Sequence, residues 1–295
     1  MPITVKNLSY TYMKGTPYER AALKNVSLEV EDGVFLGIIG ATGSGKSTFI
    51  KHLNGLIKLT EGNGGIVVDG IDLTAKKPDL KLVRQKIGMV FQYPESQLFA
   101  ETVLDDVCYG PRNMKKSREE CEALAKEAMT LAGLDFENFK GRSPFELSGG
   151  EKRRAAIAGV IACRPEYLIL DEPSAGLDPK GKDDIYALIG RIRAVDKVTV
   201  VVVSHDVDEI CEYADRIAAF DKGEIFAEFD AEDIGEYGRV LREKGLGIPL
   251  TARVAEELKR RGIEADFKVR EKDFTESVLR YYAAKRAVKK EGGGL

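Results

Sequence analysis

Three glycines, a lysine and a serine near the N-terminus have the spacing of a phosphate-binding turn. They follow an apolar run at residues 35–39, in the order Gly40, Ala41, Thr42, Gly43, Ser44, Gly45, Lys46, Ser47 and Thr48. Glycines let successive backbone N–H groups turn toward one anion at the start of a helix. Lys46 would reach the β- and γ-phosphates of a nucleotide, and the Ser47 hydroxyl would bind Mg²⁺. This spacing should arise by chance in only roughly 1% of chains of this length, so we predict nucleotide binding.

Polar side chains follow three later apolar segments that we expect to be strands, at residues 87–91, 167–170 and 198–203. They are Gln92, the pair Asp171 and Glu172, and His205. Ligands of an open α/β sheet bind beyond the carboxyl ends of its strands. The four predicted strand ends, including the one at Gly40, should therefore lie together.

These residues can be given roles in phosphoryl transfer to water. Asp171 would hold Mg²⁺ through water, and Glu172 would polarise the attacking water as a general base; an ion-paired loop is the structural alternative. Gln92 would orient that water or complete the Mg²⁺ shell, unless it is a plain polar loop residue. His205 is one of two histidines, and its place at a strand end favours contact with the γ-phosphate over simple packing.

A second candidate anion site lies at Ser148, Gly149 and Gly150, which open a helix predicted to run over residues 152–161. The serine and the glycines leave N–H groups bare at the positive end of that helix. This site cannot easily serve the phosphate bound by Lys46. A nucleotide on a partner subunit is the more economical assignment. The basic run at 152–154 is predicted to be a solvated helix face.

Hydrophobic periodicity predicts the elements that position these residues. Strands at 3–12 and 26–30 suggest an antiparallel β layer, and a capping box at Ser117 and Glu120 starts a helix that stops at Gly133. Tyr12 ends the first strand, where it would either stack on a base or pack beside Tyr10. Further predictions are a helix at 48–57, a strand at 66–72, a hairpin at 217–228, amphipathic helices at 251–261 and 275–287, and a frayed tail at 291–295.

The composition of the 295 residues is that of an ordinary globular protein. The net charge is -3 and both signs are interspersed, so the sequence shows no basic cluster of the kind that binds nucleic acid. The longest apolar runs, 155–163 and 198–203, are too short to cross a bilayer, so any membrane association should be through a partner. Four separated cysteines and an N-terminus without a leader pattern fit a reducing cytoplasm.

The full ordered set of motifs resembles the ATP-binding subunit of ABC transporters over about residues 1–230. It comprises the phosphate loop, Gln92, Leu-Ser-Gly-Gly-Glu at 147–151, Leu-Ile-Leu-Asp-Glu-Pro at 168–173, Ser-Ala-Gly-Leu-Asp at 174–178, and His205. The resemblance implies an α/β fold: a RecA-like P-loop NTPase core at 1–94 and 166–230 with an antiparallel β layer, an inserted helical subdomain at 95–165, and a helical dimerisation region at 231–295. It also implies that two subunits sandwich two ATP molecules. Each ATP would lie between the phosphate loop of one chain and Ser148, Gly149 and Gly150 of the other, with adenine stacked on Tyr12.

A narrower resemblance lies in residues 51–56, 91–99 and 153–159, which look like the energy-coupling factor (ECF) ATPases of the A-prime type. It implies an ATP hydrolase that couples ATP and Mg²⁺ binding to uptake of a vitamin or transition-metal ion. The implied partners are a second, similar ATPase in a heterodimer or homodimer, a transmembrane coupling protein and a substrate-binding membrane protein. The subunit would be peripheral, on the cytoplasmic face of the cell membrane. Residues 231–247 depart from the family pattern.

Other functional classes fit less well. Another class of ABC transporter remains an alternative. Soluble ABC proteins of DNA repair need a long coiled coil between Gln92 and the signature, where this chain has only residues 93–147, and translation types carry two ATPase units in one chain. Glu172 and His205 argue against a partner that binds ATP without hydrolysing it.

The segment at 94–107 is a candidate contact with the membrane partner, because it follows Gln92 directly. It combines an acidic pair with apolar residues that we expect to be exposed, although packing inside the helical subdomain is the alternative. These residues are Asp105, Asp106, Leu98, Phe99 and Val103.

Overall fold

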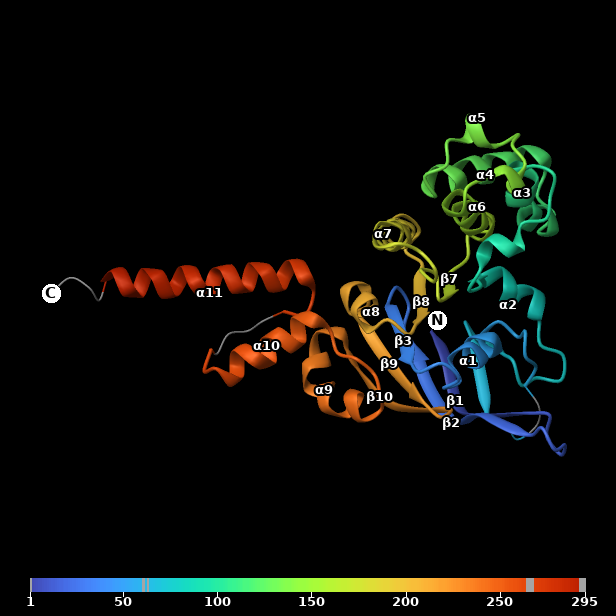
Figure 1. Ribbon diagram of the computed structural model, residues 1–295. Coiled ribbons are helices and arrows are strands. Elements are labelled where there is room, and N and C mark those ends of the chain that lie inside the picture. Colours follow the sequence, from blue (N-terminus) through green and yellow to red (C-terminus); the bar gives the residue numbers. More distant parts are fainter. Residues whose placement is uncertain (1, 60–61, 63, 264–267, 292–295) are drawn as a thin grey trace.

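The structure is a computed structural model that describes residues 2–59, 62, 64–263 and 268–291. Its centre is a six-stranded sheet in the order β10-β9-β3-β8-β7-β6 (Figure 1). The strands are β3 (Phe35–Gly40), β6 (Ile87–Val90), β7 (Tyr167–Asp171), β8 (Thr199–Ser204), β9 (Arg216–Asp221) and β10 (Glu224–Asp230). All pairs are parallel except β9 and β10, and every residue of β3, β7 and β8 is buried. Continuous apolar runs form these strands because both faces of the sheet are covered.

A second sheet is antiparallel, in the order β2-β1-β4-β5. It consists of β1 (Ile3–Tyr12), β2 (Arg20–Val30), β4 (Gly65–Val68) and β5 (Ile71–Asp72). Its buried residues share one apolar cluster with the helix α1 (Lys46–Leu53) and with one face of the six-stranded sheet. The predicted antiparallel layer is therefore confirmed. It packs against α1, which also packs against the six-stranded sheet.

Two boundaries in this sheet correct the sequence-based prediction. Strand β2 begins at Arg20 rather than at residue 26, because it pairs with β1 as far as Tyr12. The strand predicted at 66–72 is two strands. Asp69 and Gly70 both have positive φ, 46° and 79°, which produces a tight hairpin between them.

The segment 94–161 forms the cluster of helices drawn in green in Figure 1. It contains η1 (Pro94–Gln97), α3 (Val103–Asn113), α4 (Arg118–Leu131), α5 (Phe136–Phe139), η2 (Pro144–Glu146) and α6 (Gly149–Ile161), and α2 (Leu80–Lys86) precedes it. The capping box predicted at Ser117 and Glu120 is present. Apolar residues such as Val107, Met129 and Ile157 are fully buried at the centre of this cluster.

The last third of the chain adds helices around the β9–β10 hairpin, which is confirmed with Lys222 and Gly223 at positive φ. The amphipathic helices α10 (Leu250–Arg260) and α11 (Glu271–Glu291) match the two predicted ones, and α11 extends away from the sheets (Figure 1). Sequence analysis missed α7 (Pro179–Asp196), α8 (Val207–Tyr213), η3 (Ala231–Asp233) and α9 (Ile234–Glu243). Apart from Glu291, the predicted tail lies outside the described residues.

Among the described residues, no helix has both the length and the apolar character that a membrane span requires. All four cysteines are free. Three of them are buried and Cys163 is half-buried, in keeping with a packing role. The division of the chain at residues 94, 165 and 230 stays a prediction.

Candidate nucleotide-binding site

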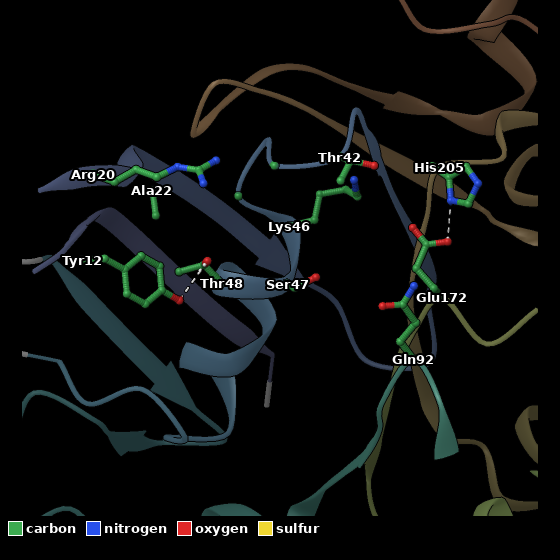
Figure 2. Close-up of a pocket in the computed structure, with 12 residues that line it drawn as sticks. Tyr12, Arg20, Ala22, Thr42, Lys46, Ser47, Thr48, Gln92, Glu172 and His205 are labelled. Atoms are coloured by element: carbon green, nitrogen blue, oxygen red, sulfur yellow. Dashed lines mark hydrogen bonds and ion pairs between the residues drawn. The ribbon is translucent and has the colours of Figure 1, made fainter. Parts of the chain in front are cut away.

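One cavity, of about 330 Å³, lies beyond the carboxyl ends of the parallel strands. Figure 2 shows Gln92, Glu172 and His205 along one side of it, facing Lys46 and Ser47. Most of the residues predicted to bind nucleotide in this chain therefore come together. The cavity is lined by Tyr12, Arg20, Ala22, Thr42, Gly43, Gly45, Lys46, Ser47, Thr48, Gln92, Glu172 and His205.

The phosphate loop joins β3 to α1 in a backbone shape that requires glycine. Gly45 is the N-cap of α1 with φ of 110°. A Cβ atom there would lie 2.6 Å from the carbonyl oxygen of Ala22, so no other residue fits. Ser44 is buried, and its hydroxyl has no hydrogen-bond partner within the described part of the chain. Buried polar groups are normally paired, so this hydroxyl is an exception, although Ser44 is not among the residues that line the cavity.

Lys46 is buried beneath this loop. Its Nζ donates to the carbonyl oxygens of Gly40 and Ala41, at 2.5 and 3.0 Å. Desolvation by burial lowers the pKa of Lys46, and the carboxylates of Glu172 and Asp171 partly oppose that shift. A bound phosphate would add a full negative charge beside the ammonium, so it would stabilise the charged form.

Asp171 is buried beside the cavity and is not part of its lining, but it contacts the lining residue Ser47, and together they offer oxygen atoms that suit a divalent cation. The Ser47 hydroxyl donates to Oδ1 of Asp171 at 3.2 Å, and burial raises the pKa of Asp171. In the described ranges there is no group of three His, Cys, Asp or Glu side chains that could hold a metal alone. That fits Mg²⁺ at a nucleotide, which takes one or two protein oxygens and completes its shell with phosphates and water.

Glu172 follows β7 in a left-handed backbone conformation with φ of 51°. This conformation costs a non-glycine residue about 1 kcal/mol or more. Its N–H donates to the carbonyl of Val203 at 2.9 Å, which ties the residue to β8. The Glu172 carboxylate lies 2.7 Å from Nδ1 of His205, whose side chain is 66% exposed at the cavity mouth. The fold therefore aims one carboxylate and one imidazole at the phosphate loop.

Tyr12 is at the other end of the cavity, with its ring partly exposed (37%). Its hydroxyl lies 3.2 Å from Oγ1 of Thr48, and Tyr10 contacts the ring edge-on, with centroids 4.9 Å apart. Tyr10 in turn packs against the buried His52. Tyr10 thus takes the packing position, and Tyr12 presents its ring to the cavity.

Arg20 and Ala22 are cavity residues that sequence analysis missed. Arg20 pairs directly with Tyr12 across β1 and β2. It reaches the phosphate loop, since a Cβ atom on Gly43 would lie 3.1 Å from the guanidinium. Only the β1–β2 register places it there. Because that register depends on where β2 begins, hydrophobic periodicity alone could not predict that Arg20 lines the cavity.

The second anion site is separate from this cavity. Ser148, Gly149 and Gly150 are outside its lining, and Ser148 and Gly149 are exposed at the start of α6. The expectation of bare N–H groups is wrong for Ser148. Its N–H donates to Glu151 at 2.8 Å, and its hydroxyl accepts from the N–H of Glu151 at 3.4 Å. This capping box pairs the N–H groups of Ser148 and Glu151 in the first turn of α6. The helix also begins at Gly149, three residues before the predicted start.

Two surface predictions are corrected. Arg153 is buried, so residues 152–154 are not simply a solvated face. In the candidate membrane contact, Leu98 and Val103 pack in the core, whereas Phe99 is 60% exposed. Asp106 holds the turn before α3, because its carboxylate accepts from the N–H groups of Phe99 and Ala100. The exposed apolar surface is therefore narrower than predicted.

A family profile described as ABC transporter matches residues 23–175. Among curated relatives, an energy-coupling factor transporter ATP-binding protein EcfA2 from Clostridium perfringens is 47% identical over 275 residues, which cover 93% of this chain and 94% of the relative. The EcfA2 protein of Symbiobacterium thermophilum is 48% identical over 262 residues, covering 89% and 90%.

Solved structures with the same fold include cbiO1 from Clostridium perfringens, described as part of the ABC transporter complex cbiONQ. It is 33% identical with a TM-score of 0.71, and the match covers 86% of this chain and 98% of cbiO1. The ABC cassette MJ0796, as a dimer in a post-hydrolysis state bound to ADP and Pi, is 35% identical with a TM-score of 0.68, covering 78% and 98%. The predicted α/β fold class is confirmed.

Proposed function

Because the chain belongs to the ABC transporter ATP-binding family, and within it to the energy-coupling factor (ECF) ATP-binding proteins, we propose that it hydrolyses ATP to drive uptake through membrane partner subunits. It is an enzyme, the ATPase subunit of an ECF-type importer. The main observation behind this function is that the phosphate loop faces Gln92, Glu172 and His205 across one and the same cavity.

Residues of the phosphate loop, from Gly40 to Thr48, bind the nucleotide phosphates. Backbone N–H groups of the loop donate to phosphate oxygens, and Lys46 neutralises the β- and γ-phosphates. Ser47, Asp171 and Gln92 would hold Mg²⁺, which neutralises charge on the phosphates when it is bound. This assignment rests on the oxygen atoms that Ser47 and Asp171 bring together.

Glu172 is the general base, and it accepts a proton from the attacking water. The Glu172 carboxylate is held by the ring of His205, whose Nδ1 lies 2.7 Å away. His205 contacts the γ-phosphate and orients Glu172, and Gln92 positions the water. Tyr12 stacks on adenine, and Arg20 adds a second positive charge beside the phosphate loop.

Ser148, Gly149 and Gly150 act on a nucleotide held by a second ATPase subunit. Their separation from the cavity with Lys46 supports this assignment. The structurally similar MJ0796 cassette is itself described as a dimer with ADP and Pi. The second subunit is a similar paralogue or another copy of this chain, and the C-terminal helices after residue 231 extend that contact.

The membrane partners are a transmembrane coupling protein and a substrate-binding protein, and the cargo is a vitamin or a transition-metal ion. The ATPase is a peripheral subunit on the cytoplasmic face. A groove of about 270 Å³, with Phe99 and Tyr109 on its rim, suits a helix of the coupling protein. Both aromatic side chains are exposed and contact each other edge-on, with centroids 4.9 Å apart.

ATP hydrolysis by the purified complex tests the enzymatic part of this function. The complex, isolated in detergent through a tag on this chain, should release phosphate from ATP only with Mg²⁺ and should contain two membrane proteins. Phosphate release that is independent of Mg²⁺, or a chain that purifies without membrane proteins under all detergent conditions, would contradict the proposal.

A further inference from the structure

Arg153 joins the signature end of α6 to the loop that follows the general base. It lies five residues after Ser148 and is only 4% exposed. Its guanidinium donates to the carbonyl oxygens of Pro173 and Ala175, at 3.0 and 3.1 Å. Both acceptors are in the loop that begins at Glu172. A planar guanidinium can bind two such oxygens at once, which a lysine ammonium does less rigidly.

The same side chain also contacts the segment after Gln92. Nε of Arg153 lies 3.5 Å from the carboxylate of Glu95, in η1. Neither of these two atoms has a hydrogen-bond partner among the described residues. A buried charge is stable only when it is paired, so Glu95 is the counter-ion that allows Arg153 to be buried. One side chain thus connects α6, η1 and the loop after β7.

Movement of this loop would move the general base. The N–H of Ala175 donates to the carbonyl of Glu172 at 3.1 Å, so the residues form one tight turn. On its other side the loop is held by Ser174, whose hydroxyl donates to Glu209 of α8 at 2.6 Å. Arg153 therefore fixes the side of the turn that faces α6.

We propose that Arg153 is a positioning residue that holds Glu172 and the segment after Gln92 at a fixed place relative to Ser148. The catalytic base of one nucleotide site then keeps its spacing from the signature that serves the other site. This proposal rests on the proposed function, and it assigns to the basic run at 152–154 a role beyond a solvated face. Arg153 is absent from the cavity lining, so we assign it no direct contact with the nucleotide of this chain.

The test is to measure kcat, KM and ATP affinity for Arg153→Gln, Arg153→Lys and Glu95→Gln in the purified complex. We expect kcat to fall at least tenfold in Arg153→Gln, and less in Arg153→Lys, which keeps the charge. ATP affinity of each isolated chain should stay within twofold of wild type, because the cavity is untouched. Glu95→Gln should lower kcat about threefold or more and add little to Arg153→Gln, because both changes disrupt one contact.

Arg164→Gln is the matched control. Arg164 lies just beyond the other end of α6, and its ion pair with Glu127 is exposed. The control should keep kcat within twofold. A purely structural role would lower ATP affinity and melting temperature together with kcat. That pattern, or wild-type kcat in Arg153→Gln, would overturn the proposal. If Arg153→Gln does not fold, an unchanged kcat in Glu95→Gln overturns it instead.

Wild type and Glu172→Gln are assayed in parallel, which separates failure of this proposal from failure of the proposed function. An active wild type, an inactive Glu172→Gln and a fully active Arg153→Gln would refute only the positioning role. An inactive wild-type complex would contradict the proposed function and, with it, this inference.

Discussion

The two helix N-termini to which we assign phosphate binding are built differently. The first, at α1, lies in a cavity with Lys46, Glu172 and His205 around it. The second, at α6, is exposed, and Ser148 is engaged with its own Glu151. One is therefore ready to bind a nucleotide within a single chain. We propose that the other acts on a nucleotide brought by a second chain.

Electrostatics strengthens this contrast. The hydrogen bonds from Ser148 lower the pKa of Glu151, so a carboxylate stands at the α6 N-terminus at neutral pH. That carboxylate accepts the N–H of Ser148, so this helix end is less positive than the phosphate loop and attracts an anion less strongly. The cavity instead holds the two cations Lys46 and Arg20 close to the phosphate loop. An isolated chain should therefore bind ATP at α1 and not at α6.

The largest expected effect comes from Glu172→Gln, on the α1 side of the comparison. Loss of a positioned general base should lower kcat by about 10²- to 10⁴-fold. ATP affinity should be unchanged, because the amide keeps the shape of the carboxylate and Lys46 is intact. Steady-state phosphate release measures the rate, and a value near that of wild type would refute the assignment of the base.

Tyr12→Ala should weaken ATP binding about 5- to 100-fold, since stacking of a base on an aromatic ring contributes about 1–3 kcal/mol. Tyr12→Phe is the control, because it keeps the ring and loses only the contact with Thr48. It should bind ATP within about threefold of wild type. Equal losses in both variants would show that the hydroxyl, and not stacking, is what matters.

Arg20→Gln tests the cavity residue that sequence analysis missed. An exposed cation near the phosphates should contribute about 1 kcal/mol, or roughly fivefold in ATP affinity, and less at high salt. Titration at two ionic strengths measures both effects. An affinity that is independent of Arg20 at low salt would mean that the guanidinium does not reach the nucleotide.

Stability should respond in opposite directions at the two sites. The folded-state pKa of Asp171 is raised by burial, so the ionised form is disfavoured by the fold. The free energy of unfolding therefore falls as pH rises from the unfolded-state pKa of Asp171 to its folded-state pKa. At neutral pH it stays lower than it is below both pKa values. Asp171→Asn removes this cost, and it should raise the free energy of unfolding by about 1 kcal/mol without nucleotide.

Ser148→Ala removes a cap, so it should lower the free energy of unfolding by about 1 kcal/mol. Urea unfolding at pH 7.5 measures both variants. The increase in the free energy of unfolding caused by Asp171→Asn should become smaller as pH falls toward about 4, the ordinary pKa range of a carboxyl group. A destabilised Asp171→Asn at neutral pH would contradict the sign of the argument.

Much of the cavity could be predicted because its chemistry is encoded locally. Gly45, Lys46 and Asp171 stand next to the strand ends that fix their place, so spacing and apolar runs were enough. Helix α7 also had a local start signal, Asp178 followed by Pro179, which sequence analysis did not use.

The remaining positions depend on contacts between segments far apart in the chain. Arg20 reaches the cavity through a cross-strand register, and Arg153 is buried because Glu95 and the loop after Glu172 meet it. Leu98 and Val103 are covered by the helices around them. No periodicity within one segment shows which partner covers its surface.

ATP affinity of the isolated chain, measured for Ser148→Arg and Lys46→Ala, tests the central claim most directly. If the two sites serve different nucleotides, Ser148→Arg should bind ATP as wild type does under dilute, monomeric conditions. Lys46→Ala should lose affinity by about tenfold or more, because a charge-assisted contact to phosphate is removed. A Ser148→Arg monomer that loses ATP affinity as severely as Lys46→Ala would place both sites on one nucleotide and contradict the account.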